Sequence, residues 1–278
     1  MTAPPILTDL TALDRHRRRA LGLPGHAAAM FLHGLAADDL QERLLEVNRR
    51  FTSPALITAF PKIWHGLLPD ALLTHPGEVL PLAQGTHDLV IHALSLHWAN
   101  DPLGQLIQCR RALKPDGLFL AVMFGGQTLQ ELRSSLAEAE SRVTGGLSPR
   151  VLPMAEIRDL GALMQRAGFA LPVADSVTQT VHYASLSALM ADLRAMGETS
   201  ALAARPRHFT RPAILSKAEA IYRANFPAPD GRITATFEMV FLTGWAPHES
   251  QQQPLRPGSA KARLADALRV PELPLNSD

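Results

Sequence analysis

The chain has 278 residues, of which 46% are hydrophobic and 19% are charged, and its formal net charge is +1. This composition is typical of a globular protein with a sizeable core and excludes an intrinsically disordered chain. The near-neutral charge provides no global field that would recruit nucleic acid or a membrane. The single cysteine, Cys109, excludes a disulfide framework and a cysteine-based metal cluster. We expect no secretory signal and no membrane span, because no apolar run has the required length or flanks.

The first 50 residues have the apolar spacing of amphipathic helices. Four arginines, Arg15, Arg17, Arg18 and Arg19, form a basic cluster within them. Such a cluster fits an anionic surface or a solvated helix face, and the neighbouring acidic residues favour the solvated face.

Short apolar runs at residues 55–60, 88–91 and 117–124 predict strands of a parallel sheet that helices cover on both sides. A helix over 102–113 joins the last two runs and ends at Lys114-Pro115-Asp116-Gly117, where proline and glycine stop a helix. These segments together predict a βαβ unit.

The remainder of the chain alternates between predicted helices and strands. Helices are expected over 154–167, 186–196 and 211–225, and strands over 169–173, 176–183 and 233–242. The last strand alternates polar Thr236 and Glu238 with Phe237 and Met239, which predicts a half-exposed edge or antiparallel strand. We divide the chain into an N-terminal helical segment (1–50), a main domain (51–248) with a helical insertion (186–225), and a flexible tail (249–278).

Several segments resemble one family of known proteins. LVIHALSLHWANDP and RALKPDGLFLAVMFGG look like the fourth and fifth strands of class I S-adenosylmethionine-dependent methyltransferases. FGGQTLQELR, GGLSPRVLPMAEIRDLGALMQRAGF, ADLRAMGET and TFEMVFLTGWAPHES are similar to the methyltransferase-like complex I assembly factors, the arginine hydroxylase family. The resemblance implies an α/β, Rossmann-like doubly wound sheet and S-adenosylmethionine as cofactor. It also implies a protein partner, either a complex I subunit or an assembly factor.

The resemblance also assigns site residues. The loop after the fourth strand touches the cofactor in this family, which here implies cofactor contacts from His92, Ala93, Leu94, His97 and Trp98. No residue is assigned a catalytic role and no metal is expected, although His92, His97 and Asp101 form an alternative, distributed set of iron ligands. A working surface would also include Gly125–Gln127, with Arg133 and Arg150 as anchors for an acidic partner.

The chain departs from the family where the glycine-rich cofactor loop belongs. AFPKIWHG places Phe60, Pro61 and Ile63 where small residues allow close approach, and His75-Pro76 replaces the acid that binds the ribose. Residues 55–88 have room for about one βαβ unit, so the first half of the sheet is abbreviated. We therefore expect S-adenosylmethionine to bind weakly or not at all, with Phe60 and Trp64 filling the emptied space.

Two functions are consistent with these observations. The first is a degenerate methyltransferase, a pseudoenzyme that acts in respiratory complex I assembly from the cytoplasm, at most peripherally at the inner face of the membrane. The second is an active S-adenosylmethionine-dependent enzyme that modifies a protein arginine or a malonyl-carrier acceptor. Neither function involves nucleic acid.

Overall fold

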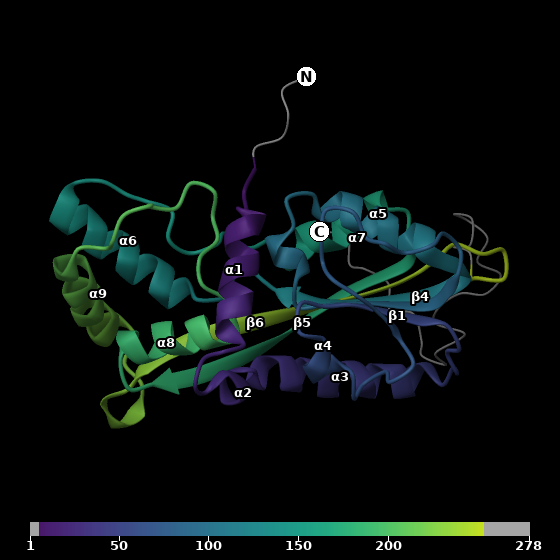
Figure 1. The fold of residues 1–278 in the computed structure, drawn as a ribbon, viewed down its shortest axis with the longest axis horizontal. Helices are drawn as coiled ribbons and strands as arrows, with labels where there is room; N and C mark the ends of the chain where they lie inside the picture. The colour runs from purple at the N-terminus through teal and green to yellow at the C-terminus, as the bar shows by residue number, and fades with distance from the viewer. Residues whose placement is uncertain (1–5, 253–278) are drawn as a thin grey trace, which may run out of the picture. The chain divides into compact units, whose positions relative to one another are not determined.

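The computed structural model describes residues 6–252, and within them six strands form a single sheet in the order β2-β1-β3-β4-β6-β5 (Figure 1). Strands β2, β1, β3 and β4 are parallel neighbours, whereas β6 runs antiparallel to both β4 and β5. The strands are β1 (Pro54–Ile57), β2 (Leu72–Thr74), β3 (His87–Ala93), β4 (Leu113–Phe124), β5 (Ala170–Tyr183) and β6 (Ile233–Trp245).

Helices cover both faces of this sheet, so the predicted doubly wound α/β fold is confirmed (Figure 1). One face packs against α5 (Pro102–Ala112) and α7 (Ile157–Arg166). The other face carries α2 (His26–Ala29), α3 (Phe31–Val47), α6 (Gln130–Thr144), α8 (Leu186–Met196) and α9 (Pro212–Asn225). Helices α8 and α9 form the predicted insertion before the last strand.

The central strands are apolar on both faces because each face has its own core. Leu89 and Ile91 of β3 pack towards α3, α6 and α8, whereas Val90 packs towards α5 and α7. The residues that the sequence predicts as central core are all buried, namely Leu89, Val90, Ile91, Leu118, Leu120 and Val122. The joining helix α5 begins as expected from its sequence, since Asp101 Oδ1 accepts a hydrogen bond from the Gly104 amide at 2.7 Å and Pro102 follows the cap.

The first half of the sheet is abbreviated, as the sequence predicts. Only the four-residue helix α4 (Pro61–Trp64) lies between β1 and β2, and the segment 75–86 without helix or strand leads on to β3. The chain therefore leaves β1 to one side for β2 and returns to the other side for β3. This reversal places the topological switch point, where open α/β sheets bind ligands, between the carboxyl ends of β1 and β3.

Three details of the second half differ from the prediction. The strands expected over 169–173 and 176–183 are one strand, β5, with an irregularity in its pairing between Ala170 and Val173. Helix α7 begins at Ile157 rather than at 154. Strand β6 is antiparallel as expected, but it lies inside the sheet between β4 and β5 and is mostly buried, so the half-exposed prediction is wrong.

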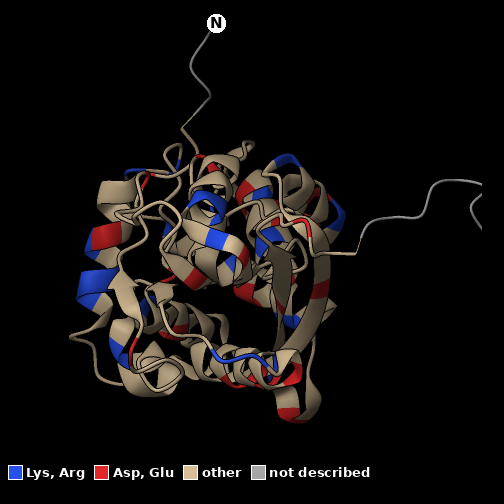
Figure 2. Cartoon of the chain, turned by 90° about the vertical axis from the view of Figure 1, so that its right-hand side faces the viewer, with Lys and Arg blue, Asp and Glu red and all other residues tan. Residues whose placement is uncertain are grey.

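Residues 6–247 form one compact unit. From residue 253 onward, the predicted flexible tail lies outside the described residues. Acidic and basic residues are interspersed along the helices in Figure 2, in keeping with the small net charge. No helix of residues 6–252 combines the length and apolarity that a membrane crossing requires.

Candidate functional site

The switch-point crevice is filled by the protein's own side chains. Phe60, directly after β1, is buried, and its ring makes an edge contact with His33 at a centroid distance of 5.2 Å. A β-carbon built on Gly197 would lie 3.0 Å from Phe60 Cζ and 3.4 Å from Arg17 Cα. Glycine at the end of α8 therefore allows Phe60 and helix α1 (Leu10–Ala20) to close over the ends of β1 and β3.

The residues at this crevice do not fit S-adenosylmethionine. The turn from Thr58 to His65 contains no glycine, and no acidic residue ends β2 or follows it directly, where the ribose-binding acid of the family would lie. A pocket of about 20 Å³ lies between α1, residues 76–78 and the loop after β3, and its lining includes Arg17, Ser95 and Gln105. That volume holds about one water molecule, so no reaction step is assigned to the cofactor.

Arg17 corrects the interpretation of the basic cluster as a solvated face. Its side chain is buried, with 5% of the residue exposed, and burial lowers the pKa of the guanidinium. Its Nε and Nη2 atoms have no hydrogen-bond partner within the described part of the chain. Such buried, unpaired donors are costly, so Arg17 marks a polar interior at the carboxyl edge of the sheet.

Two histidines in the same region are held neutral. Trp64 Nε1 donates to His33 Nδ1 at 3.0 Å, which places the ring proton of His33 on Nε2. His92 Nε2 lies 2.8 Å from Gln105 Oε1, while Gln105 Nε2 donates to the Gly77 carbonyl, so His92 carries its proton on Nε2. Burial lowers the pKa of His33 to about 3 and the pKa of His92 to about 4.

Glu198, just after α8, is a buried carboxylate with one free oxygen. Its Oε2 accepts a hydrogen bond from Trp98 Nε1 at 2.7 Å and lies 3.3 Å from His97 Nε2. Its Oε1 has no partner among residues 6–252, and its side chain is 6% exposed. Burial alone would raise the pKa of Glu198, but the hydrogen bonds from His97 and Trp98 and the charge of Arg17 lower it below the usual range. The carboxylate is therefore ionised at neutral pH.

Glu198 lines a cavity of about 280 Å³ on the β4 side of the switch point. The cavity lies between the loop after β3, α6, α8 and the segment 150–154. Most of its wall is apolar, including Leu129, Leu132, Leu193 and Phe237. The charged residues of the lining are Glu198, Arg194 and Arg150, of which Arg150 is paired with Glu140. An apolar wall with an ionised, half-paired carboxylate suits a group with an aliphatic stem and a hydrogen-bond-donating head.

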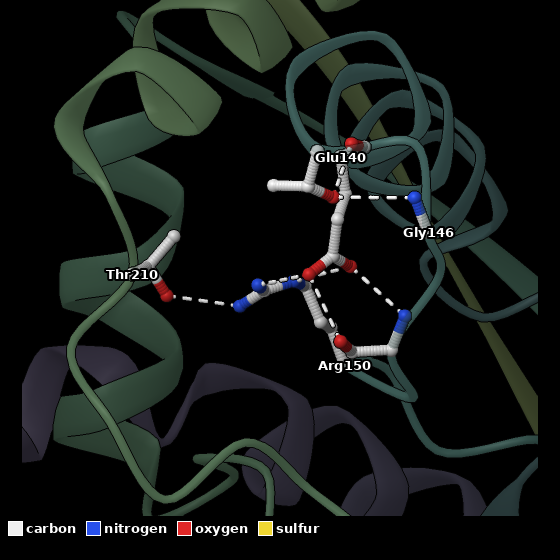
Figure 3. Close-up of polar contacts among 6 residues, drawn as sticks. Glu140, Gly146, Arg150 and Thr210 are labelled. Atoms are coloured by element: carbon white, nitrogen blue, oxygen red, sulfur yellow. Dashed lines mark hydrogen bonds and ion pairs between the residues drawn. The ribbon is translucent and has the colours of Figure 1, made fainter.

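A buried ion pair holds the edge of this cavity (Figure 3). Arg150 Nε donates to Glu140 Oε2 at 3.0 Å, Arg150 Nη2 donates to Glu140 Oε1 at 2.6 Å, and Arg150 Nη1 donates to Thr210 Oγ1 at 2.9 Å. Arg133 donates to the Thr128 carbonyl at 3.2 Å. The expectation that Arg150 anchors an acidic partner is wrong, because Glu140 neutralises its guanidinium, whereas the expectation for Arg133 stays a prediction.

The structure separates the five residues that the resemblance assigns to a cofactor. His97 and Trp98 meet at Glu198, whereas the side chain of His92 contacts Gln105 of α5. Ala93 and Leu94 are buried beside β4, and the Leu94 amide donates to the Val122 carbonyl at 2.9 Å.

The alternative iron site does not assemble. Asp101 caps α5 and His97 contacts Glu198, so these two side chains are committed to different partners. No group of three His, Cys, Asp or Glu side chains within residues 6–252 is arranged to hold a metal ion. The glycine pair after β4 has a steric role, since a β-carbon on Gly125 or Gly126 would collide with the carboxylate of Glu238 or Glu156.

Sequence reasoning missed Glu198 and the burial of Arg17. The segment ADLRAMGET enters the sequence argument only through its resemblance, and nothing in its composition distinguishes Glu198 from an ordinary acid after a helix. Glu198 can be recognised as a site residue only in the folded structure, where Trp98, 100 residues earlier in the sequence, donates a hydrogen bond to it.

Comparisons with known proteins find similar sequences in one family. The methyltransferase domain family matches residues 32–121. The mitochondrial arginine hydroxylase NDUFAF5 of Danio rerio is 40% identical over 206 residues, which cover 74% of this chain and 64% of that protein. A malonyl-[acyl-carrier protein] O-methyltransferase of Halorhodospira halophila is 32% identical over 243 residues, which cover 87% and 79% of the two chains. An S-adenosylmethionine-dependent methyltransferase structure from Thermotoga maritima matches 84% of this chain and 99% of its own at 13% identity, with a TM-score of 0.45.

The match to NDUFAF5 is the more identical one, but the chain spans less than two thirds of the length of that Danio rerio protein. The match to the Halorhodospira halophila enzyme covers more of both proteins. Together with the doubly wound sheet, these matches confirm the resemblance seen in the sequence. The chain belongs to the methyltransferase family, and its relatives include the arginine hydroxylase NDUFAF5.

Proposed function

We propose that this chain is a methyltransferase-family protein that no longer uses S-adenosylmethionine and that acts in respiratory complex I assembly by binding a partner protein. The observation that carries the proposal is the contrast between a crevice filled by Phe60 and Arg17, with a pocket of only about 20 Å³ beside it, and a neighbouring cavity of about 280 Å³. A cavity of the latter size is near the lower end of the range for ligand pockets. The relatives named arginine hydroxylase NDUFAF5 support the biological setting.

In this proposal, the cavity binds a basic side chain of a complex I subunit or assembly factor. Glu198 would supply the negative charge that attracts the basic head, and the leucine-lined wall would cover the aliphatic stem. His97 and Trp98 act as positioning residues, because they hold Glu198 Oε2. His92, Ala93 and Leu94 support the loop from within the core.

The setting is the cytoplasm, with at most peripheral contact at the inner face of the membrane. We assign the binding site to the domain over 51–248, with 1–50 as an N-terminal helical segment and 249–278 as a flexible tail. No nucleic acid partner is proposed, since the net charge is +1.

Calorimetric titration with S-adenosylmethionine tests the first half of this proposal. No heat of binding is expected, because Phe60 and Arg17 occupy the crevice.

The second candidate function, an active enzyme acting on a protein arginine or a malonyl-carrier acceptor, is favoured by the coverage of the malonyl-carrier relative. Micromolar binding of the cofactor would support that candidate and contradict ours.

Replacing Glu198 tests the second half. In cells that lack the wild-type chain, Glu198→Gln should lower the amount of assembled complex I relative to the amount of the variant protein present. Glu46→Gln, on the exposed face of α3, is the matched control and should restore assembly fully. Normal assembly with Glu198→Gln would show that the cavity is not the working site.

A further inference from the structure

Two loops, 145–151 after α6 and 203–211 before α9 (Figure 1), lie at the edge of the cavity and are joined by a hydrogen bond. Both loops expose large apolar side chains. We call them the rim loops. Phe209 is 100% exposed and Leu147 is 71% exposed. Arg150 joins the two loops through its bond to Thr210, and both of these residues also line the cavity (Figure 3). The exposed side chains of Phe209 and Leu147 therefore belong to two loops that are held together at Arg150 and Thr210.

The surroundings of Phe209 are basic. Residues 199–218 contain the basic side chains Arg205, Arg207, Arg211 and Lys217 together with His208, and no acidic residue. Asp9 contacts Arg205 at 3.1 Å and Arg207 at 3.3 Å, but the Arg207 side chain remains largely exposed. Arg211 is exposed as well. The rim loops thus combine projecting apolar tips with an excess of positive charge.

We propose that the rim loops dock the protein on an anionic lipid bilayer. Phe209 and Leu147 enter the boundary between headgroups and acyl chains, while Arg207, His208 and Arg211 contact lipid phosphates. A bilayer suits this surface because the apolar tips project from loops into solvent and do not line a groove that a folded partner would fill. The positive charge selects anionic over neutral lipid.

The buried Arg150–Glu140 ion pair beneath the rim loops favours such docking. Glu140 accepts from Arg150 and also from the Ser148 amide and hydroxyl at 3.0 Å and 2.9 Å, so loop 145–151 is fixed at several points. Insertion of a pre-ordered tip costs less conformational entropy than insertion of a mobile one. Docking here would bring the cavity edge, through Val151 and Thr210, close to the bilayer. This surface is separate from Glu198 and does not depend on the function proposed above.

Vesicle co-sedimentation of the full chain tests this inference. Vesicles of equal parts phosphatidylcholine and phosphatidylglycerol should bind the protein, and pure phosphatidylcholine vesicles should not. Phe209→Ser with Leu147→Ser should weaken binding by at least about tenfold. Arg207→Gln with Arg211→Gln should weaken it by about thirtyfold at low salt, about fivefold for each charge.

Matched controls come from the other elements. Leu45→Ser removes a side chain that is 72% exposed on α3, and Arg158→Gln removes an exposed charge on α7, and neither should change binding. Circular dichroism must show that each variant is folded. Absence of wild-type binding, equal binding to neutral vesicles, or unchanged binding by both rim-loop variants would overturn the proposal. The first of these outcomes would leave an acidic protein as the occupant of the surface, and the last would place membrane contact elsewhere on the chain.

Discussion

Acidification should destabilise the fold through two buried histidines. His33 and His92 have pKa values of about 3 and about 4, compared with 6.5 for an ordinary imidazole, chiefly because burial disfavours the charged ring. Below about pH 6.5 the unfolded chain binds protons at these positions and the folded chain does not. Unfolding therefore takes up protons, and stability is lost as the pH falls from about 6.5 towards these lowered pKa values.

The size of the effect follows from the pKa values. Each histidine removes about 1.4 kcal/mol per pH unit within its window, or about 2 kcal/mol at pH 5, so the two together remove about 4 kcal/mol. The carboxylates of Asp88, Glu140 and Glu198 have lowered pKa values, so their contribution is lost only as the pH falls through and below the ordinary range of a carboxyl. The loss between neutral pH and about pH 5 therefore reports mainly on the histidines.

Urea denaturation at about pH 7.5 and about pH 5, at constant ionic strength, measures this loss as the difference in free energy of unfolding. In His92→Gln the difference should shrink by about 2 kcal/mol. His65→Gln, at an exposed position, should leave the difference unchanged. Equal stability at the two pH values, or the same difference in His92→Gln as in the wild type, would refute the reasoning.

Three further changes should alter stability in ways that the contacts predict, each measured as a shift of the urea midpoint. Glu140→Gln leaves a largely buried guanidinium without its counter-charge and should cost about 3–5 kcal/mol, whereas Glu138→Gln, in an exposed pair, should cost less than about 1 kcal/mol. Leu120→Ala, in the central strand β4, should cost about 2–5 kcal/mol. Gly197→Ala forces a side chain into a left-handed backbone with φ of 86° against a neighbouring ring, and should cost at least about 1 kcal/mol.

The sheet was largely predictable because its central strands are buried on both faces. Segments such as 117–124 are then apolar without alternation, and the Pro and Gly residues before them mark the ends of helices. The burial of strand β6 could not be predicted in this way, because the charged residue Glu238 gives its sequence the alternating pattern of a half-exposed strand. The burial of Glu238 depends on a distant turn, in which the Gln127 amide donates to Glu238 Oε2 at 2.9 Å. A local pattern contains no information about such a partner.

Some properties of the candidate site could likewise be predicted from the local sequence, and others depend on contacts between distant segments. The loss of the cofactor loop is a local property of residues 58–76, and the sequence is sufficient to identify it. The burial of Arg17 is not local, because it requires helix α1 to lie against Gly197 of the insertion. The carboxylate of Glu198 likewise gains its character only from contacts that join segments far apart in the chain.

Trp98 connects the closed crevice to the open cavity. Its side chain lines both spaces, and its Nε1 atom donates to Glu198. Glu198 is also a negative charge near Arg17, which is buried without a hydrogen-bonded partner in the described chain. Removal of the Glu198 carboxylate therefore affects both spaces. It leaves the Trp98 indole without an acceptor, and it leaves the Arg17 guanidinium without a nearby negative charge. Glutamine keeps an acceptor for Trp98 but loses the charge, whereas alanine loses both. A stability loss shared by Glu198→Gln and Glu198→Ala would arise from the lost charge beside Arg17 and His97, and the loss seen only with alanine would arise from the lost acceptor of Trp98.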